Sequence, residues 1–168
     1  DPCDLFTVTP SYFTCADVGQ EFVVQVADGA SGNFCWSTVL IEDKIPPTPI
    51  CYSSLSISLD IDGNAYITPD MVDAGSYDNC SQLTFELSDS TFNCTNIGNN
   101  NVVSMTVTDV GGNTSQCFTI VNVEDNTAPE FIYPENINLE CNGNTDPSIT
   151  GEPIIIDNCG TYGMSYND

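Results

Sequence analysis

The sequence predicts an all-β protein built from tandem antiparallel β-sandwich modules of about 80 residues each. Three observations support this fold class. A pattern centred on a cysteine occurs twice, short apolar runs alternate with polar residues, and cysteines fall at equivalent places along the chain. No stretch shows a sustained helical apolar period, so we expect almost no helix.

The repeat is clearest in residues 109–129, DVGGNTSQCFTIVNVEDNTAP, which are matched upstream by residues 28–47, DGASGNFCWSTVLIEDKIPP. Each copy has an Asp, a Gly-Asn turn, a Cys, a β-branched run, a Glu-Asp pair and then proline. Another pattern, Asp-Asn-Cys, occurs at residues 78–80 and again at 157–159. A β-branched run before proline is typical of a last strand followed by a linker.

The repeat divides the chain into three parts. Residues 1–44 are interpreted as the C-terminal half of a module, residues 45–125 as a complete module, and residues 126–168 as the N-terminal half of a further module. Two interpretations stay open. The sequence is a window on a longer repeat array, or the two halves complete one another between neighbouring subunits.

Within the complete module, apolar residues alternate as they do in half-buried strands. In chain order the expected strands are residues 54–59, 65–67, 83–87, 102–108 and 116–123. Residues 60–64, DIDGN, resemble the start of an EF-hand loop, but no Glu follows at the twelfth position, so we expect a turn with Gly63 at positive φ. A short helical turn is expected near residues 69–74.

Nine cysteines in 168 residues, without any CxxC pair or histidine, predict disulfides in an oxidising compartment rather than a zinc site. The four cysteines of the complete module allow three pairings. We favour the pairing that also works within each half module, and Cys3 is then left over. The expected pairs are Cys51–Cys80, Cys94–Cys117, Cys15–Cys35 and Cys141–Cys159.

The chain carries 24 acidic residues against a single basic one, Lys44, giving a net charge of −23. This charge argues against nucleic acid and anionic membranes as partners. We expect no membrane span, because no apolar stretch is long enough. An enzyme is not expected either, because the chain has no His and no Ser in a nucleophile elbow, and a small sandwich offers little room for a cleft between two carboxylates.

Converging carboxylates need a counter-ion, and a chain with one lysine cannot supply enough of them. In an immunoglobulin-like sandwich, the loops before the third and last strands meet the incoming linker at one end. Oxygen ligands of this kind suit Ca²⁺. A structural calcium site is therefore expected at each junction between modules; the alternative is ordinary turn chemistry and a solvating acidic coat. The candidate ligands are Glu42, Asp43, Asp78, Asn79, Asp109 and Asn113 at the first junction, and Glu124, Asp125, Asp157 and Asn158 at the second.

Several motifs carry a family resemblance that covers nearly the whole chain. They include LDxDGxAxI, GSYDNC, FNCxNIG and VEDNTAP in residues 46–129. The chain resembles the hyalin-repeat-type immunoglobulin-like modules found in tandem on cell-surface and gliding-motility-associated adhesins of Bacteroidota. This resemblance implies an immunoglobulin-like fold, secretion, and a role in adhesion or in an extracellular appendage. Residues 124–131, EDNTAPEF, are similar to the calcium-binding linker of cadherins. Residues 89–91, DST, resemble a Bacteroidota O-glycan acceptor, with Ser90 as the modified residue.

Two functions follow as expectations. The first is a structural repeat protein of an extracellular fibre, stalk or adhesin, whose disulfide-linked modules are stiffened by Ca²⁺ and whose copies assemble head to tail. The alternative is an adhesin module that binds a surface glycan or a host protein, which would need exposed aromatic residues. Trp36, the only tryptophan, is expected in the core instead, because it follows Cys35 on a strand.

Overall fold

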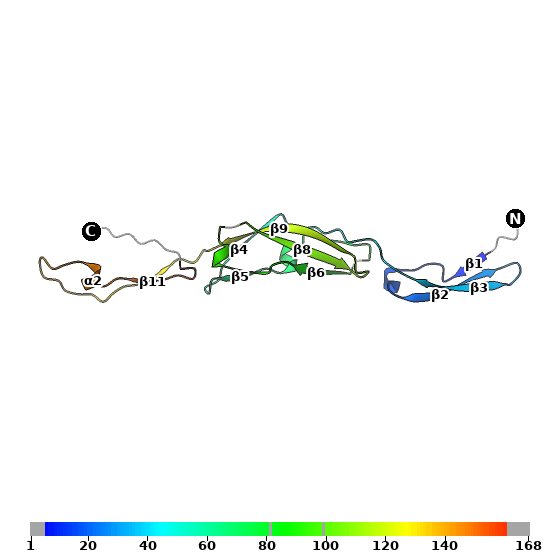
Figure 1. The fold of residues 1–168 in the computed structure, drawn as a ribbon, viewed down its shortest axis with the longest axis horizontal. Coiled ribbons are helices and arrows are strands. Elements are labelled where there is room, and N and C mark those ends of the chain that lie inside the picture. Colours follow the sequence, from blue (N-terminus) through cyan, green and yellow to red (C-terminus); the bar gives the residue numbers. More distant parts are fainter. Residues whose placement is uncertain (1–5, 81, 99, 161–168) are drawn as a thin grey trace.

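The computed structural model describes residues 6–80, 82–98 and 100–160. The protein is elongated, and its strands form three groups in a row (Figure 1). Each described strand forms hydrogen-bonded pairs only with strands of its own group. We call these groups the N-terminal segment (residues 6–44), the middle segment (45–125) and the C-terminal segment (126–160). Their interpretation as two half modules and one complete module stays a prediction.

The middle segment is a β-sandwich, as the sequence predicts. One sheet has four strands in the order β4-β9-β8-β6, and the other pairs β5 with β7. The strands are β4 (Ser54–Ser58), β5 (Asn64–Tyr66), β6 (Leu83–Leu87), β7 (Thr91–Asn93), β8 (Asn100–Asp109) and β9 (Thr114–Glu124). Two sheets facing each other can bury one side of each strand.

One pairing departs from the expected antiparallel pattern, because β4 runs parallel to β9. The elongated shape explains it. The chain enters the middle segment from the N-terminal side and leaves toward the C-terminal side (Figure 1). The first and last strands therefore run in the same direction, and they must pair in parallel when they are neighbours.

The core lies between the two sheets of the middle segment, and all buried hydrophobic residues of the described chain belong to this segment. Alternation places them there. In β8, Val103, Met105 and Val107 are buried, whereas Val102 is 62% exposed. The remaining core residues are Ile57, Leu59, Ala65, Ile67, Val72, Phe92, Val121 and Val123.

The N-terminal segment is a single antiparallel sheet in the order β1-β2-β3. Its strands are β1 (Phe6–Thr9), β2 (Glu21–Asp28) and β3 (Phe34–Leu40), with the 3₁₀ turn η1 (Cys15–Asp17) between the first two. Val26 pairs with Cys35 and Val24 with Ser37, so these residues share one face of the sheet. No other described strand joins this sheet, and the ring of Phe13 lies 5.2 Å from that of Phe22 on the same face.

Trp36 is 69% exposed, so the expectation of a core position was wrong. The strand register gives the reason. Trp36 pairs with Gln25, on the opposite face from Cys35 and Val26, and its ring lies 5.8 Å from that of Phe34. Following a cysteine on a strand places a residue on the other face from that cysteine.

The C-terminal segment contains only a two-stranded sheet and a helical turn. Strand β10 (Glu130–Ile132) pairs with β11 (Ile154–Ile156), and α2 (Pro147–Thr150) lies between them in the sequence. Phe131, Ile137 and Leu139 are each more than 40% exposed. This segment therefore has no buried hydrophobic residue among those described.

The expected helical turn near residues 69–74 is present as α1 (Pro69–Val72). Proline at the first turn suits a helix start, because its missing N–H would have no partner there. The middle segment also contains the 3₁₀ turn η2 (Cys94–Asn96). The turn at residues 60–64 is likewise confirmed, with Gly63 at a φ of +74° and its N–H donating to the Asp60 carbonyl at 3.0 Å.

Candidate functional site

Three disulfides link six of the eight described cysteines, and none is a pair expected from the sequence. They are Cys15–Cys80, Cys51–Cys117 and Cys94–Cys159. The expected pairs Cys51–Cys80, Cys94–Cys117, Cys15–Cys35 and Cys141–Cys159 were therefore wrong. Only Cys51–Cys117 closes within one segment. The other two each cross from one segment to the next.

The position of the Asp-Asn-Cys loop explains this error. Cys80 lies at the end of the middle segment that faces the N-terminal segment, and there it meets Cys15 in η1. Cys159 meets Cys94 in η2 at the corresponding place. Both crossing disulfides have a sequence separation of 65 residues. This equal spacing of the two cysteine pairs could have been found in the sequence. The pairs Cys15–Cys35 and Cys94–Cys117 would have closed loops of unequal length.

Cys35 and Cys141 are free and exposed. Cys3, expected to be left over, lies outside the described residues. The two crossing disulfides define two junctions. The first junction joins the N-terminal and middle segments, and the second joins the middle and C-terminal segments.

Asp43 lies at the centre of the first junction and is only 8% exposed. It lies on the linker, where its Oδ1 accepts a hydrogen bond from the Ile45 N–H at 3.0 Å. Its Oδ2 accepts a hydrogen bond from Asn79 Nδ2 at 3.2 Å. Its main-chain carbonyl accepts one from Asn113 Nδ2 at 3.0 Å. A single linker residue is thus bonded to two loops of the middle segment.

Asp109 is the second buried acid of this junction, at 7% exposure. It is the last residue of β8, and its two carboxylate oxygens accept hydrogen bonds from the main-chain N–H and the Nδ2 of Asn113 at 2.8 and 2.9 Å. The loop between β8 and β9 also packs closely on the linker. A Cβ at Gly111 would lie 2.8 Å from both the Cβ and the carbonyl oxygen of Asp43.

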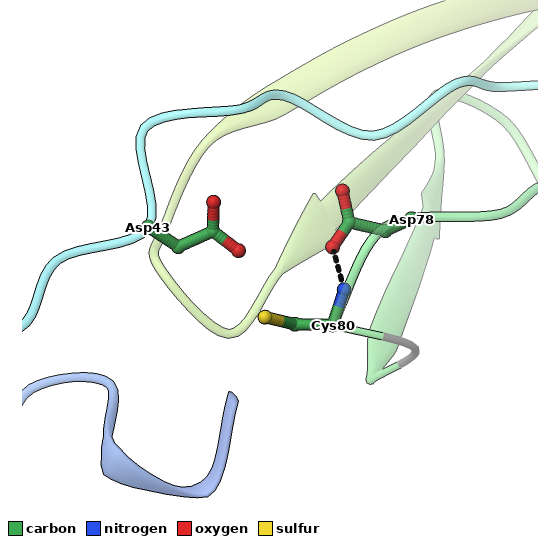
Figure 2. A group of neighbouring side chains, drawn as sticks. All are labelled: Asp43, Asp78 and Cys80. Atoms are coloured by element: carbon green, nitrogen blue, oxygen red, sulfur yellow. Dashed lines mark hydrogen bonds between the residues drawn. The ribbon is translucent and has the colours of Figure 1, made fainter. Parts of the chain in front are cut away.

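Asp78 supplies a carboxylate oxygen without a partner. Its Oδ2 accepts the N–H of Cys80 at 2.8 Å, whereas its Oδ1 is buried and has no hydrogen bond within the described chain. Figure 2 shows Asp43 and Asp78 reaching toward the same space from the linker and from the loop before β6. An oxygen of each, together with Cys80 Sγ, lies within 4.8 Å of the others.

These atoms favour a hard cation with oxygen ligands. Two carboxylates at this separation repel by about 3.5 kcal/mol at an effective dielectric constant near 20. Cys80 Sγ cannot act as a thiolate ligand, because it is bonded to Cys15. The carboxylate oxygens of Asp43 and Asp78 remain, and carboxylate oxygens are ligands that Ca²⁺ prefers. A cation bound here would give the buried Asp78 Oδ1 the partner that it lacks in the described chain.

The structure brings together five of the six residues proposed for the first junction. Asp43 contacts Asn79 and Asn113, Asn113 contacts Asp109, and Asp78 faces Asp43. Glu42 is the exception. Its carboxylate forms an exposed ion pair with Lys44 at 3.0 Å.

The second junction is less closely connected. Asp125 Oδ1 accepts the Thr127 N–H at 3.0 Å, and Asp157 Oδ1 accepts the N–H groups of Cys159 and Gly160. Glu124 Oε2 lies 3.5 Å from Asn126 Nδ2. Among the described residues, no hydrogen bond joins any two of the four candidate ligands of this junction, which include Asn158. Asn158 Oδ1 is nevertheless buried and without a partner in the described chain, which places an orphaned oxygen at this junction too.

The remaining candidate, Ser90, is exposed in the connection between β6 and β7, while its main-chain carbonyl accepts the Ile67 N–H at 2.9 Å. Its modification stays a prediction. No helix in the described part of the chain is long and apolar enough to cross a membrane.

No protein-family model matches the chain, and no curated protein matches it. Among solved structures, it is similar to the extracellular cadherin domains 1–4 of protocadherin gamma B7, with a TM-score of 0.33 and 11% identity over 80% of this chain. It is also similar to the human desmocollin-1 ectodomain, with a TM-score of 0.29 and 14% identity over 73% of this chain. The chain spans 46% and 30% of the length of these two proteins.

Proposed function

We propose that this chain is a structural component of an extracellular fibre, stalk or adhesin, in which disulfides and calcium ions hold successive β-segments in line. The observation that carries the proposal is the construction of the first junction. There a disulfide crosses between segments, and a buried linker aspartate is bonded to two loops of the next segment. Such contacts resist bending of a linker that Pro46 and Pro47 already restrict.

Calcium is the cation that best fits the first junction. Asp43 on the linker and Asp78 in the loop before β6 offer carboxylate oxygens that lie within 4.8 Å of one another. An ion bound to oxygens from the linker and from the loops would oppose their separation. The protein itself provides little alternative neutralisation, because its single lysine is paired with Glu42 on the surface.

Thermal unfolding in excess EGTA and then in about 10–100 mM Ca²⁺ tests the calcium proposal. Extracellular modules bind Ca²⁺ with Kd values of about 10⁻⁴–10⁻³ M, and ligand at 100 times Kd stabilises by about 2.7 kcal/mol. For a sandwich of this size, that corresponds to a rise in Tm of roughly 10–20 °C.

Asp43→Asn should remove most of this rise. Glu86→Gln is the matched control, because it deletes one negative charge from an exposed position of β6. A wild-type Tm that is the same in EGTA and Ca²⁺ would contradict the calcium proposal, as would an equal response of the two variants.

An extracellular location accompanies this function. Three disulfides require an oxidising compartment to form and persist. The proposed partners are further copies of the chain, joined head to tail. The proposed role involves no catalysis, in keeping with the absence of histidine from the sequence.

The exposed pair Phe34 and Trp36 favours a second candidate function, recognition of a glycan or a protein. Exposed aromatic side chains on a rigid sheet suit such binding. Binding of the chain to a glycan array that is lost in Trp36→Ala would support this alternative. Tyr133→Ala, which removes an exposed aromatic residue from the C-terminal segment, is the control.

A further inference from the structure

The first junction contains an open surface depression of about 460 Å³ beside the Cys15–Cys80 disulfide, which we call the first-junction cavity. Its lining includes Phe13, Thr14, Cys15, Asp43, Lys44 and Asn79. A second cavity of about 560 Å³ lies along the same stretch of chain and shares Phe13 and Thr14 with the first. Residues 12–14 therefore face open space on a stretch that pairs with no described strand.

The second junction shows what occupies the corresponding place. The two junctions share the crossing disulfide and a contact from a cysteine Sγ to an asparagine carbonyl, at 3.6 Å for Cys15 and Asn79 and 3.4 Å for Cys94 and Asn158. In the second junction, the turn at residues 60–64 packs against this contact. Asn158 Nδ2 donates to the Asp60 carbonyl at 3.0 Å.

Gly63 makes the closest approach of this turn. A Cβ there would lie 2.8 Å from Cys94 Sγ and 2.9 Å from the Asn158 carbonyl oxygen. The following residue, Asn64, is the register partner of Asn93 in the β5–β7 pair. Asn93 corresponds in sequence to Thr14, because each precedes the cysteine of its 3₁₀ turn. The stretch that is open in the first junction is thus paired in the second.

The chain carries another turn of similar sequence, in which the positive φ falls at Asn142 rather than at the glycine. Residues 139–144, LECNGN, match residues 59–64, LDIDGN. In both turns the glycine N–H donates to the carbonyl of the acidic residue three positions earlier, at 2.7 Å for Gly143 and Glu140 and 3.0 Å for Gly63 and Asp60. Residues 140–144 are all exposed.

We propose that the turn at residues 140–144 of one copy docks into the first-junction cavity of a second copy. This inference rests on the head-to-tail assembly proposed above and identifies where it occurs. In the docked arrangement, Gly143 packs on the Cys15–Cys80 disulfide, and Asn144 lies opposite Thr14. Asn79 Nδ2 then has the Glu140 carbonyl as an acceptor, as Asn158 has the Asp60 carbonyl.

Apolar surface supports the same pairing. Ile137 and Leu139 precede the turn and are 46% and 42% exposed, whereas the matching residues Ile57 and Leu59 are buried in the middle segment. The N-terminal segment offers a sheet face on which Val8 is 45% and Val39 is 36% exposed. Docking of the turn brings Ile137 and Leu139 of one copy against this sheet face of the other copy. The apolar side chains of both surfaces are then removed from water.

One cationic side chain is available to this occupant. Lys44, the only basic residue of the chain, lines the cavity together with Asp43 and its ion-pair partner Glu42. In the linker of the second junction, the residue that matches Lys44 is Asn126. Its Nδ2 donates a hydrogen bond at 2.8 Å to the Oγ of Ser58, which lies just before the 60–64 turn. Lys44 is therefore placed to meet the acidic stretch around Glu140 of the second copy.

A cysteine trap tests the arrangement. Directly opposed residues of an antiparallel pair have Cα atoms about 4.5–5.5 Å apart, within reach of a disulfide. In a background with Cys3, Cys35 and Cys141 changed to Ser, the pair Thr14→Cys and Asn144→Cys should give a ladder of disulfide-linked oligomers on a non-reducing gel. The control places the first cysteine at Ser31, in the exposed turn between β2 and β3, and should stay monomeric.

Asn64→Cys with Asn93→Cys serves as the internal reference, because it should close within one chain and produce no ladder. Sedimentation velocity of the unaltered chain adds an independent measurement. Association should rise with concentration, weaken in Lys44→Glu and persist in Lys44→Arg. A monomer at every concentration without a ladder would overturn the docking proposal, as would equal ladders for Thr14 and Ser31. The calcium-dependent Tm rise does not depend on this result, so the two proposals can fail separately.

Discussion

Replacing the Cys15–Cys80 disulfide by two alanines should loosen the first junction while the middle sandwich stays folded. The matched variant replaces Cys51–Cys117, which closes a loop of nearly the same length, 66 residues against 65. In the chain-entropy model, each bond then stabilises by about 4 kcal/mol at 25 °C. Loop length alone therefore predicts equal effects.

The structure predicts different effects for the two variants. Cys51 and Cys117 pack against the core of the middle segment, so their loss should lower the stability of the sandwich by about 2–5 kcal/mol. Cys15 belongs to the N-terminal segment, which has no buried hydrophobic residue among those described. Its loss should chiefly free that segment to move relative to the sandwich.

Thermal unfolding and small-angle X-ray scattering together separate the two outcomes. The Cys51→Ala, Cys117→Ala variant should show a large drop in Tm with little change in the maximum dimension before melting. The Cys15→Ala, Cys80→Ala variant should show a smaller drop in Tm and a broader distribution of dimensions. Equal drops in Tm with identical scattering curves would refute the view that Cys15–Cys80 fixes the junction.

Three further predictions concern particular side chains. Met105→Ala removes a fully buried side chain from β8 and should cost about 2–5 kcal/mol of unfolding free energy in urea denaturation, whereas the exposed Val102→Ala should cost much less. Gly63→Ala should destabilise the second junction more than Gly112→Ala, although both glycines have positive φ, because only at Gly63 would the new Cβ meet other atoms; hydrogen exchange of residues 60–64 and 157–160 measures the difference. Burial of Asp73 acts to raise its pKa, but hydrogen bonds from Ser76 and the main chain outweigh this and hold the pKa below the usual value of 3.8. The ionised Asp73 therefore adds stability that is complete above the unfolded-state pKa and is lost as pH falls through the lower folded-state pKa, so unfolding between pH 5 and pH 2 should show a smaller acid-induced loss of stability in Asp73→Asn than in wild type.

The local structure of the middle segment followed from its sequence. Alternation identified β8 as a half-buried strand, and the Asp-Gly step identified the turn that closes at Gly63. Both features depend on residues close together in the chain, whose side-chain direction and backbone preference are set locally. The parallel pairing of β4 with β9 did not follow, because it depends on where the chain enters and leaves the sandwich.

The disulfides could not be obtained by the same reasoning. Pairing was expected within each module, and this assumption failed because the Asp-Asn-Cys loop lies at the junction. The convergence of Asp43 with the loops carrying Asn79 and Asn113 could be anticipated, because loops at one end of a sandwich meet regardless of their separation in sequence. Asp78, with its unpartnered Oδ1, could be named as a candidate, but its burial was visible only in the structure.

Calorimetric titration of Ca²⁺ into the chain tests the central claim most directly. We predict binding with a Kd of about 10⁻⁴–10⁻³ M that is lost in both Asp43→Asn and Asp78→Asn and retained in Glu86→Gln. Absence of calcium binding by the wild-type chain, or binding that survives both junction substitutions, would contradict the account of calcium at the first junction.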